Sequence, residues 1–64
     1  MTYIESLQEE LAEAIETSEM FRRESVRMKK FGFPLSAEGY LSASISWGKK
    51  VSKLQKMILE LKAA

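Results

Sequence analysis

The sequence has 64 residues and a formal net charge of +1 at pH 7, so it can form one small domain, which buries only about 60% of the surface that the unfolded chain exposes. It contains no cysteine, which excludes disulfides, and no histidine, which argues against a structural zinc site. Small proteins without such supports usually gain stability by oligomerisation, so we expect this chain to self-associate.

The N-terminal stretch MTYIESLQEELAEAI does not resemble a secretory signal. It carries acidic residues where a signal peptide needs a basic region followed by an apolar one. No apolar run in the sequence approaches the roughly 18 residues of a transmembrane helix. The sequence therefore predicts a cytoplasmic protein without a transmembrane segment.

A long helix is predicted over residues 3–31. Residues 1–20 carry six glutamates and no basic residue, whereas basic residues dominate the end of the segment, an order that suits the helix dipole. Gly32 can adopt the left-handed conformation that ends many helices, and Pro34 cannot continue one. The helix is therefore expected to end near Phe31.

A loop over residues 32–36 is predicted to lead into a second helix over residues 37–62. Ser36 can cap this helix with its hydroxyl group. Leu35 and Tyr40 have the spacing of a hydrophobic staple across such a cap. The chain is thus expected to reverse direction through a tight loop.

The stretch SASISWG, residues 42–48, lies in this second helix, although its serines alternate with other side chains as in a half-buried β-strand. Both flanking segments have a helical pattern, and a strand at this place would have no partner strand. We therefore interpret its small residues as contact points between helices. The predicted fold is all-α, an antiparallel, coiled-coil-like hairpin of two long helices that forms a single domain over residues 1–64.

A heptad pattern connects the two helices. Apolar and small residues recur at alternate spacings of three and four, and these a and d positions form the predicted contact line, which we call the seam. We expect a positions to face d positions of the other helix, which sets Phe21 against Ser44 and Ser18 against Trp47. Each large side chain then faces a small one, as dense packing requires. The seam consists of Ile4, Leu7, Leu11, Ala14, Ser18, Phe21, Ser25 and Met28 with Ala37, Tyr40, Ser44, Trp47, Val51, Leu54, Ile58 and Leu61.

The two flanks beside the seam differ in polarity. The flank at heptad positions e and b is largely apolar, whereas the opposite flank carries charged residues. One narrow seam is a small core for two helices, so the second apolar stripe predicts a homodimer in which these flanks pack into an antiparallel four-helix bundle. The alternative is that these residues pack within the hairpin or are scattered surface apolar residues. The predicted self-association residues are Ala12, Ile15, Val26, Leu41, Ile45, Gly48 and Leu59.

Catalysis is not expected from this sequence. General acid–base chemistry usually relies on histidine or a buried carboxylate, and the glutamates occupy mostly solvent-facing helix positions. The serines lack a histidine base, and the three glycines are too dispersed to form a phosphate-binding loop. The sequence therefore predicts no catalytic, metal-binding or cofactor-binding residue and no cofactor.

Basic residues gather near the loop, beside Phe31 and Phe33. Such a cluster could contact phosphates while an aromatic ring stacks on a base, so nucleic-acid binding is the alternative function. The competing interpretation is that Phe33 packs on Met28 at the helix end and that the basic residues only oppose the helix dipole. The candidate contacts with a partner or with nucleic acid are Arg22, Arg23, Arg27, Lys29, Lys30 and Phe33.

A third interpretation is that Trp47 and the lysines of the second helix lie on an anionic membrane surface. The seam position of Trp47 argues against it, because a seam residue is expected to be buried. The sequence favours a small non-enzymatic module for protein–protein interaction, a regulator, inhibitor or assembly subunit that self-associates as a helical hairpin and binds another protein.

Overall fold

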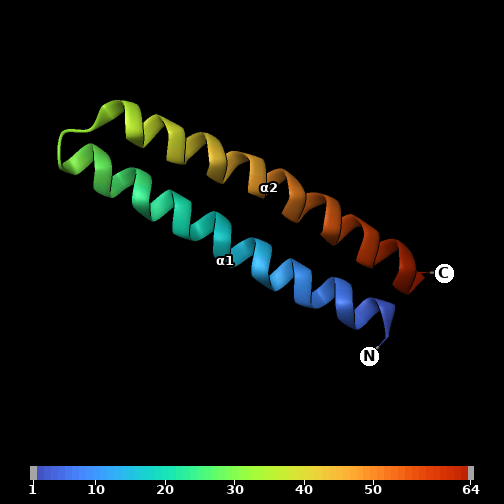
Figure 1. Cartoon of the computed structure of the whole chain (residues 1–64). Helices are drawn as coiled ribbons and strands as arrows, with labels where there is room; N and C mark the ends of the chain where they lie inside the picture. Colours follow the sequence, from blue (N-terminus) through green and yellow to red (C-terminus); the bar gives the residue numbers. More distant parts are fainter. Residues whose placement is uncertain (1, 64) are drawn as a thin grey trace.

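The computed structural model describes residues 2–63 as two antiparallel helices joined by a tight turn (Figure 1). Helix α1 spans Tyr3–Lys30 and helix α2 spans Pro34–Ala63. They form a rod with extents of 49 × 18 × 11 Å, and both termini lie at the end opposite the turn, here called the open end. The predicted all-α hairpin is confirmed, and residues 42–48 are helical.

Helix α1 begins with a cap that the sequence analysis did not identify. The Glu5 amide donates a hydrogen bond of 3.2 Å to the Thr2 hydroxyl oxygen, and this hydroxyl donates to the Glu5 carboxylate at 3.1 Å. The exchange resembles a capping box, which satisfies an amide that has no partner within the helix.

Gly32 ends helix α1 as predicted. Its φ angle of 84° is in the left-handed region. The Gly32 amide donates to the Lys29 carbonyl at 3.2 Å, and the Phe33 amide donates to the Met28 carbonyl at 2.8 Å. This is the Schellman pattern, which satisfies carbonyl groups that the helix leaves free.

Helix α2 begins three residues earlier than predicted. Pro34 is its first residue, and the Ala37 amide donates to the Phe33 carbonyl at 3.0 Å to close the first turn. The first position of a helix suits proline, because no hydrogen bond is required from its nitrogen there and its fixed φ is helical. Pro34 therefore starts α2 rather than separating the helices.

The earlier start overturns the predicted cap of α2. Ser36 lies within the first turn and cannot be the capping residue. Leu35 is 83% exposed, so it forms no hydrophobic staple with Tyr40. The predicted loop over residues 32–36 is correspondingly shorter, since the helices are separated only by residues 31–33.

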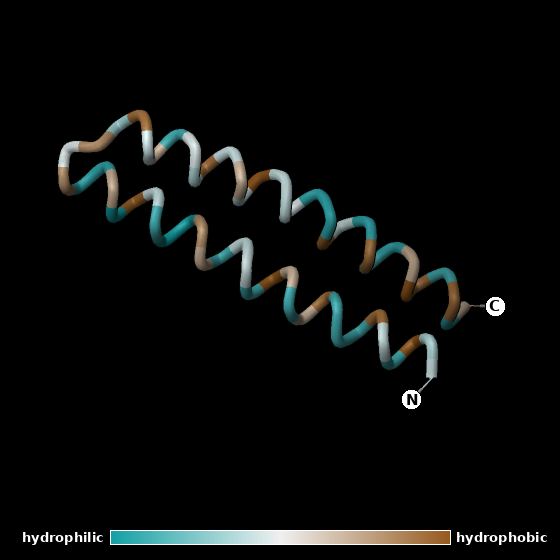
Figure 2. The backbone as a smooth tube through the Cα atoms, in the orientation of Figure 1, coloured by the Kyte–Doolittle hydropathy of each residue, from teal (hydrophilic) through white to brown (hydrophobic). Residues whose placement is uncertain are grey.

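The hydrophobic core follows the predicted seam. In Figure 2, hydrophobic segments recur at intervals along both helices, as expected for amphipathic helices. The residues that pack together toward the open end are Leu7, Ala14, Leu54 and Ile58, with Leu11, Trp47, Val51 and Met57 against them. Every buried residue among those described is a seam residue, namely Leu7, Ala14, Ser25, Ala37, Ser44, Leu54 and Ile58.

The register between the helices differs from the predicted one by about one helical turn. Ser18 lies opposite Ser44 rather than Trp47: the Ser18 hydroxyl donates to the Ser44 carbonyl at 3.1 Å, and the Ser44 hydroxyl donates to the Ser18 carbonyl at 3.0 Å. The Ser25 hydroxyl likewise donates to the Ala37 carbonyl at 2.7 Å. Positions a therefore face positions a.

Small residues thus face small residues, and the predicted alternation of large against small is wrong near the turn. The rings of Phe21 and Tyr40 stack on each other, with centroids 6.1 Å apart. A buried hydroxyl requires a hydrogen-bond partner, and a carbonyl of the facing helix is within reach only where both backbones approach closely. Small residues on both sides permit that approach, whereas the predicted register would set Ser18 against the ring of Trp47.

Candidate self-association surface

Most of the predicted self-association residues are exposed in a single hairpin. The exposed ones are Ala12, Ile15, Val26, Leu41, Ile45 and Leu59, and Gly48 is partly buried. The large apolar residues among them therefore do not complete the core of the hairpin, in contrast to one interpretation that the sequence left open.

The antiparallel arrangement brings residues of both helices onto one side of the rod. Because α1 and α2 run in opposite directions, their a positions lie on the same side of the seam, with e and b positions beside them. From the rise of 1.5 Å per residue, Ile15 and Ile45 lie only about 3 Å apart along the rod axis. They form the centre of the apolar flank, near the middle of the rod.

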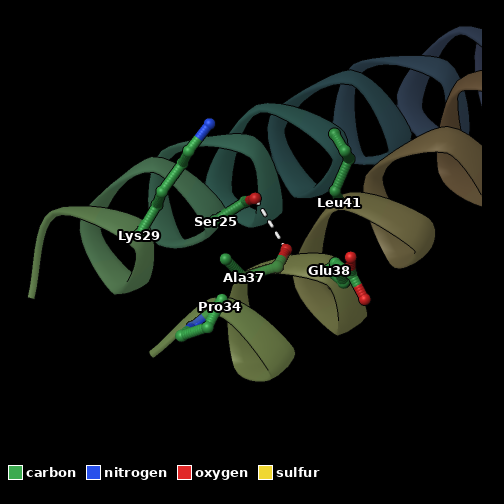
Figure 3. A pocket seen from close by; sticks show the side chains of 6 residues that line it. All are labelled: Ser25, Lys29, Pro34, Ala37, Glu38 and Leu41. Carbon is green, nitrogen blue, oxygen red and sulfur yellow. Dashed lines mark hydrogen bonds between the residues drawn. The ribbon is translucent and has the colours of Figure 1, made fainter. Parts of the chain in front are cut away.

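Two shallow hollows adjoin this flank. One, of about 290 Å³, lies near the turn and is shown in Figure 3, where Ser25 and Lys29 come from α1. The α2 residues that line it are Pro34, Ala37, Glu38 and Leu41. The other, of about 320 Å³, lies toward the open end and is lined by Leu11, Gln55, Ile58 and Leu59. The flank therefore carries a hollow toward each end.

Gly48 is a further feature of the apolar flank that packing within the hairpin does not explain. A Cβ atom built on Gly48 would meet no atom within 4 Å, leaving aside its chain neighbours and the backbone of its own helix. A glycine in a helix interior costs about 1 kcal/mol relative to alanine. The single hairpin thus has room for a side chain at a position where the sequence has none.

The opposite flank is polar. It carries charged residues from both helices, namely Glu10, Glu13, Glu24, Arg27, Lys50, Lys53 and Glu60. Arg27 and Glu24 form an ion pair of 3.7 Å within α1. These charged side chains remain solvated at little energetic cost, whereas burying the side chains of the apolar flank would be favourable.

Trp47 lies in the seam, as predicted. It is partly buried and packs against the core residues of the open half. The Lys50 ammonium lies 4.9 Å from the centroid of its ring, in cation–π geometry. Contacts within the hairpin therefore account for Trp47.

The candidate contacts at the turn are all exposed. Arg22, Arg23, Arg27, Lys29, Lys30 and Phe33 each present their side chains to solvent. Phe33 is 56% exposed, so its ring lies largely open to solvent and is not buried on Met28 as the helix-end pattern predicted. Phe31 and Leu35 are exposed beside it, and the sequence analysis did not propose Leu35 for binding.

The described part of the chain shows no group of three or more histidine, cysteine, aspartate or glutamate residues that could hold a metal ion. The hydroxyl groups of Ser18, Ser25 and Ser44 all donate to backbone carbonyls of the facing helix, so these serines have structural partners.

Neither helix, over residues 2–63, is both long and apolar enough to cross a membrane.

Comparison of the chain with protein-family models, with curated proteins and with solved structures finds no match. The functional argument therefore depends on the geometry of the hairpin.

Proposed function

We propose that this protein is a small non-enzymatic module for protein–protein interaction that acts as a self-associating helical hairpin, in the role of a regulator, inhibitor or assembly subunit. Two copies pack their apolar flanks together into an antiparallel four-helix bundle. The observation that carries this proposal is the exposure of five large apolar side chains on one flank: Ile15, Val26, Leu41, Ile45 and Leu59.

The position of the apolar flank suits a two-fold axis perpendicular to the rod. Ile15 and Ile45 lie near the middle of the rod and at nearly the same height. With an axis through this point, two hairpins overlap along their full length, and each copy contributes the same surface to the interface. Leu59 of one copy then reaches the height of Lys29 of the other, beside the hollow near the turn.

One pair of opposite charges on the flank suits opposed hairpins. Glu5 lies on this flank near the open end, whereas Arg22 and Lys29 lie on it toward the turn. Opposed copies set Glu5 of one hairpin within about one helical turn of Lys29 of the other.

Gly48 supports a close approach at the centre of this interface. It lies at an e position of the flank, between the apolar residues of the two helices. The hairpin itself has space for a side chain there, as it also has at Gly39 on the opposite flank, and the absence of a side chain at Gly48 leaves room for a second copy at the centre of the flank.

Sedimentation equilibrium on matched variants tests the proposal. The native chain should give about twice the monomer mass of 7.3 kDa at micromolar concentration. Ile45→Glu should weaken the dimer by roughly a hundredfold, because it buries an unpaired carboxylate. Ser46→Glu adds the same charge one residue away on the opposite flank and should leave the dimer intact. A native monomer, or equal effects of both variants, would refute the proposal.

A further inference from the structure

The end of the rod at the turn carries a second apolar surface, separate from the flank. Phe31 is 60% exposed, Phe33 56% and Leu35 83%. These three residues occupy alternate positions from the end of α1, through the turn, to the first turn of α2. We call them the apex. Single exposed apolar residues are common on protein surfaces, but three large ones within five positions at the end of a rod form a patch.

The turn itself does not require apolar side chains at the apex. Its geometry depends on the positive φ angle of Gly32, on backbone hydrogen bonds from Gly32 and Phe33, and on Pro34 at the start of α2. The backbone groups of other residues at positions 31, 33 and 35 would serve equally. Packing of two flanks against each other does not use the apex either, because Phe31, Phe33 and Leu35 are not residues of the apolar flank.

Positive charge surrounds the apex. Arg23, Arg27, Lys29 and Lys30 lie in the last two turns of α1 and are exposed. The Arg27 guanidinium lies 5.9 Å from the centroid of the Phe31 ring, so cation and aromatic ring are presented together. Glu24 is paired with Arg27, and Glu38 of α2 lines the hollow near the turn together with Lys29, so five exposed basic residues from Arg22 to Lys30 stand against two carboxylates. The apex therefore protrudes from a basic surface.

We propose that the apex docks on an anionic lipid surface. Phe31, Phe33 and Leu35 insert among the headgroups, while the neighbouring lysine and arginine side chains contact lipid phosphates and carboxylates. Leu35 favours a lipid surface over a nucleic acid as the ligand. Among the residues that the structure describes it is the most exposed large apolar one, and it has no aromatic face on which a base could stack. A lipid interface accepts aliphatic and aromatic side chains together.

Vesicle co-sedimentation at physiological ionic strength tests this assignment. The native chain should bind vesicles made of equal parts phosphatidylcholine and phosphatidylserine, and it should bind pure phosphatidylcholine vesicles much more weakly. Arg23→Gln and Lys30→Gln, which replace exposed basic residues outside the flank, should each weaken binding about fivefold. Leu35→Ser should also weaken it, whereas Met20→Ser, which removes an exposed apolar side chain far from the apex, should not.

All four substitutions are at exposed positions, so each variant is expected to fold. Circular dichroism checks that it does. Equal binding to both kinds of vesicle, or no binding to either, would overturn the proposal. Leu35→Ser binding as tightly as the native chain would overturn it too. If a single-stranded oligonucleotide bound while anionic vesicles did not, and if this binding were lost in Arg23→Gln and Lys30→Gln but kept in Leu35→Ser, the apex would be a nucleic-acid site instead.

Discussion

Ser18 and Ser44 exchange hydrogen bonds across the hairpin, each hydroxyl donating to the other residue's backbone carbonyl, at 3.1 and 3.0 Å. This pair fixes the register of α1 against α2 and holds the two backbones close together. It also determines that Ile15 and Ile45 lie within about 3 Å of each other along the rod axis on the apolar flank. The proposed interface therefore depends on a polar contact inside the seam.

Removing one hydroxyl of this pair should destabilise the hairpin. We expect Ser44→Ala to lower the free energy of unfolding by about 1 kcal/mol, because it deletes a buried hydrogen bond. Ser46→Ala, at an exposed position of the same helix, should change it by less than about 0.5 kcal/mol. Denaturant unfolding at one fixed protein concentration measures both values. Equal effects would show that the serine pair does not stabilise the hairpin.

Gly32 should be intolerant of any side chain. Its φ angle of 84° disfavours a residue with a Cβ atom, so Gly32→Ala should lower the free energy of unfolding by about 1 to 2 kcal/mol. Gly39→Ala provides the matched control, since Gly39 lies within a helix with a negative φ angle and should gain stability from alanine. Thermal unfolding of the two variants should therefore shift in opposite directions. A Gly32→Ala variant as stable as the native chain would contradict the observed turn.

Gly48 should separate the stability of the hairpin from that of the dimer. At low protein concentration, Gly48→Ala should stabilise the hairpin by up to about 1 kcal/mol, because alanine favours the helix. At high concentration it should weaken self-association, because the added methyl group occupies space that the second copy needs. Sedimentation together with thermal unfolding at several concentrations measures both effects. Gly39→Ala should stabilise the hairpin without weakening self-association. A Gly48→Ala dimer of unchanged affinity would argue against close approach of the two copies at this residue.

Much of the fold could be predicted from local sequence patterns. The apolar and small residues at alternate spacings of three and four identify the seam, since they must face the other helix wherever the register lies. Gly32 identifies the end of α1 because few other residues adopt its conformation. The start of α2 was ambiguous because Pro34 and Ser36 are both typical of helix starts, and the structure uses the proline.

The register could not be read from periodicity. A shift of one helical turn leaves the same residues in the seam and changes only which of them face each other. The choice depends on where the hydroxyl groups of Ser18 and Ser25 find acceptors, and these acceptors are backbone atoms of the facing helix. The observed register also explains why Leu61 is exposed, since it carries this residue past Ile4 at the open end.

Oxidative cross-linking of single-cysteine variants tests the central claim most directly, because the native chain has no cysteine. Opposed flanks bring residue 45 of both copies close to the two-fold axis, so Ile45→Cys should form a disulfide-linked dimer. Leu59→Cys alone should not, because its two copies would lie roughly 40 Å apart along the rod. A monomeric Ile45→Cys, or efficient linkage of Leu59→Cys to itself, would contradict the antiparallel flank-to-flank dimer.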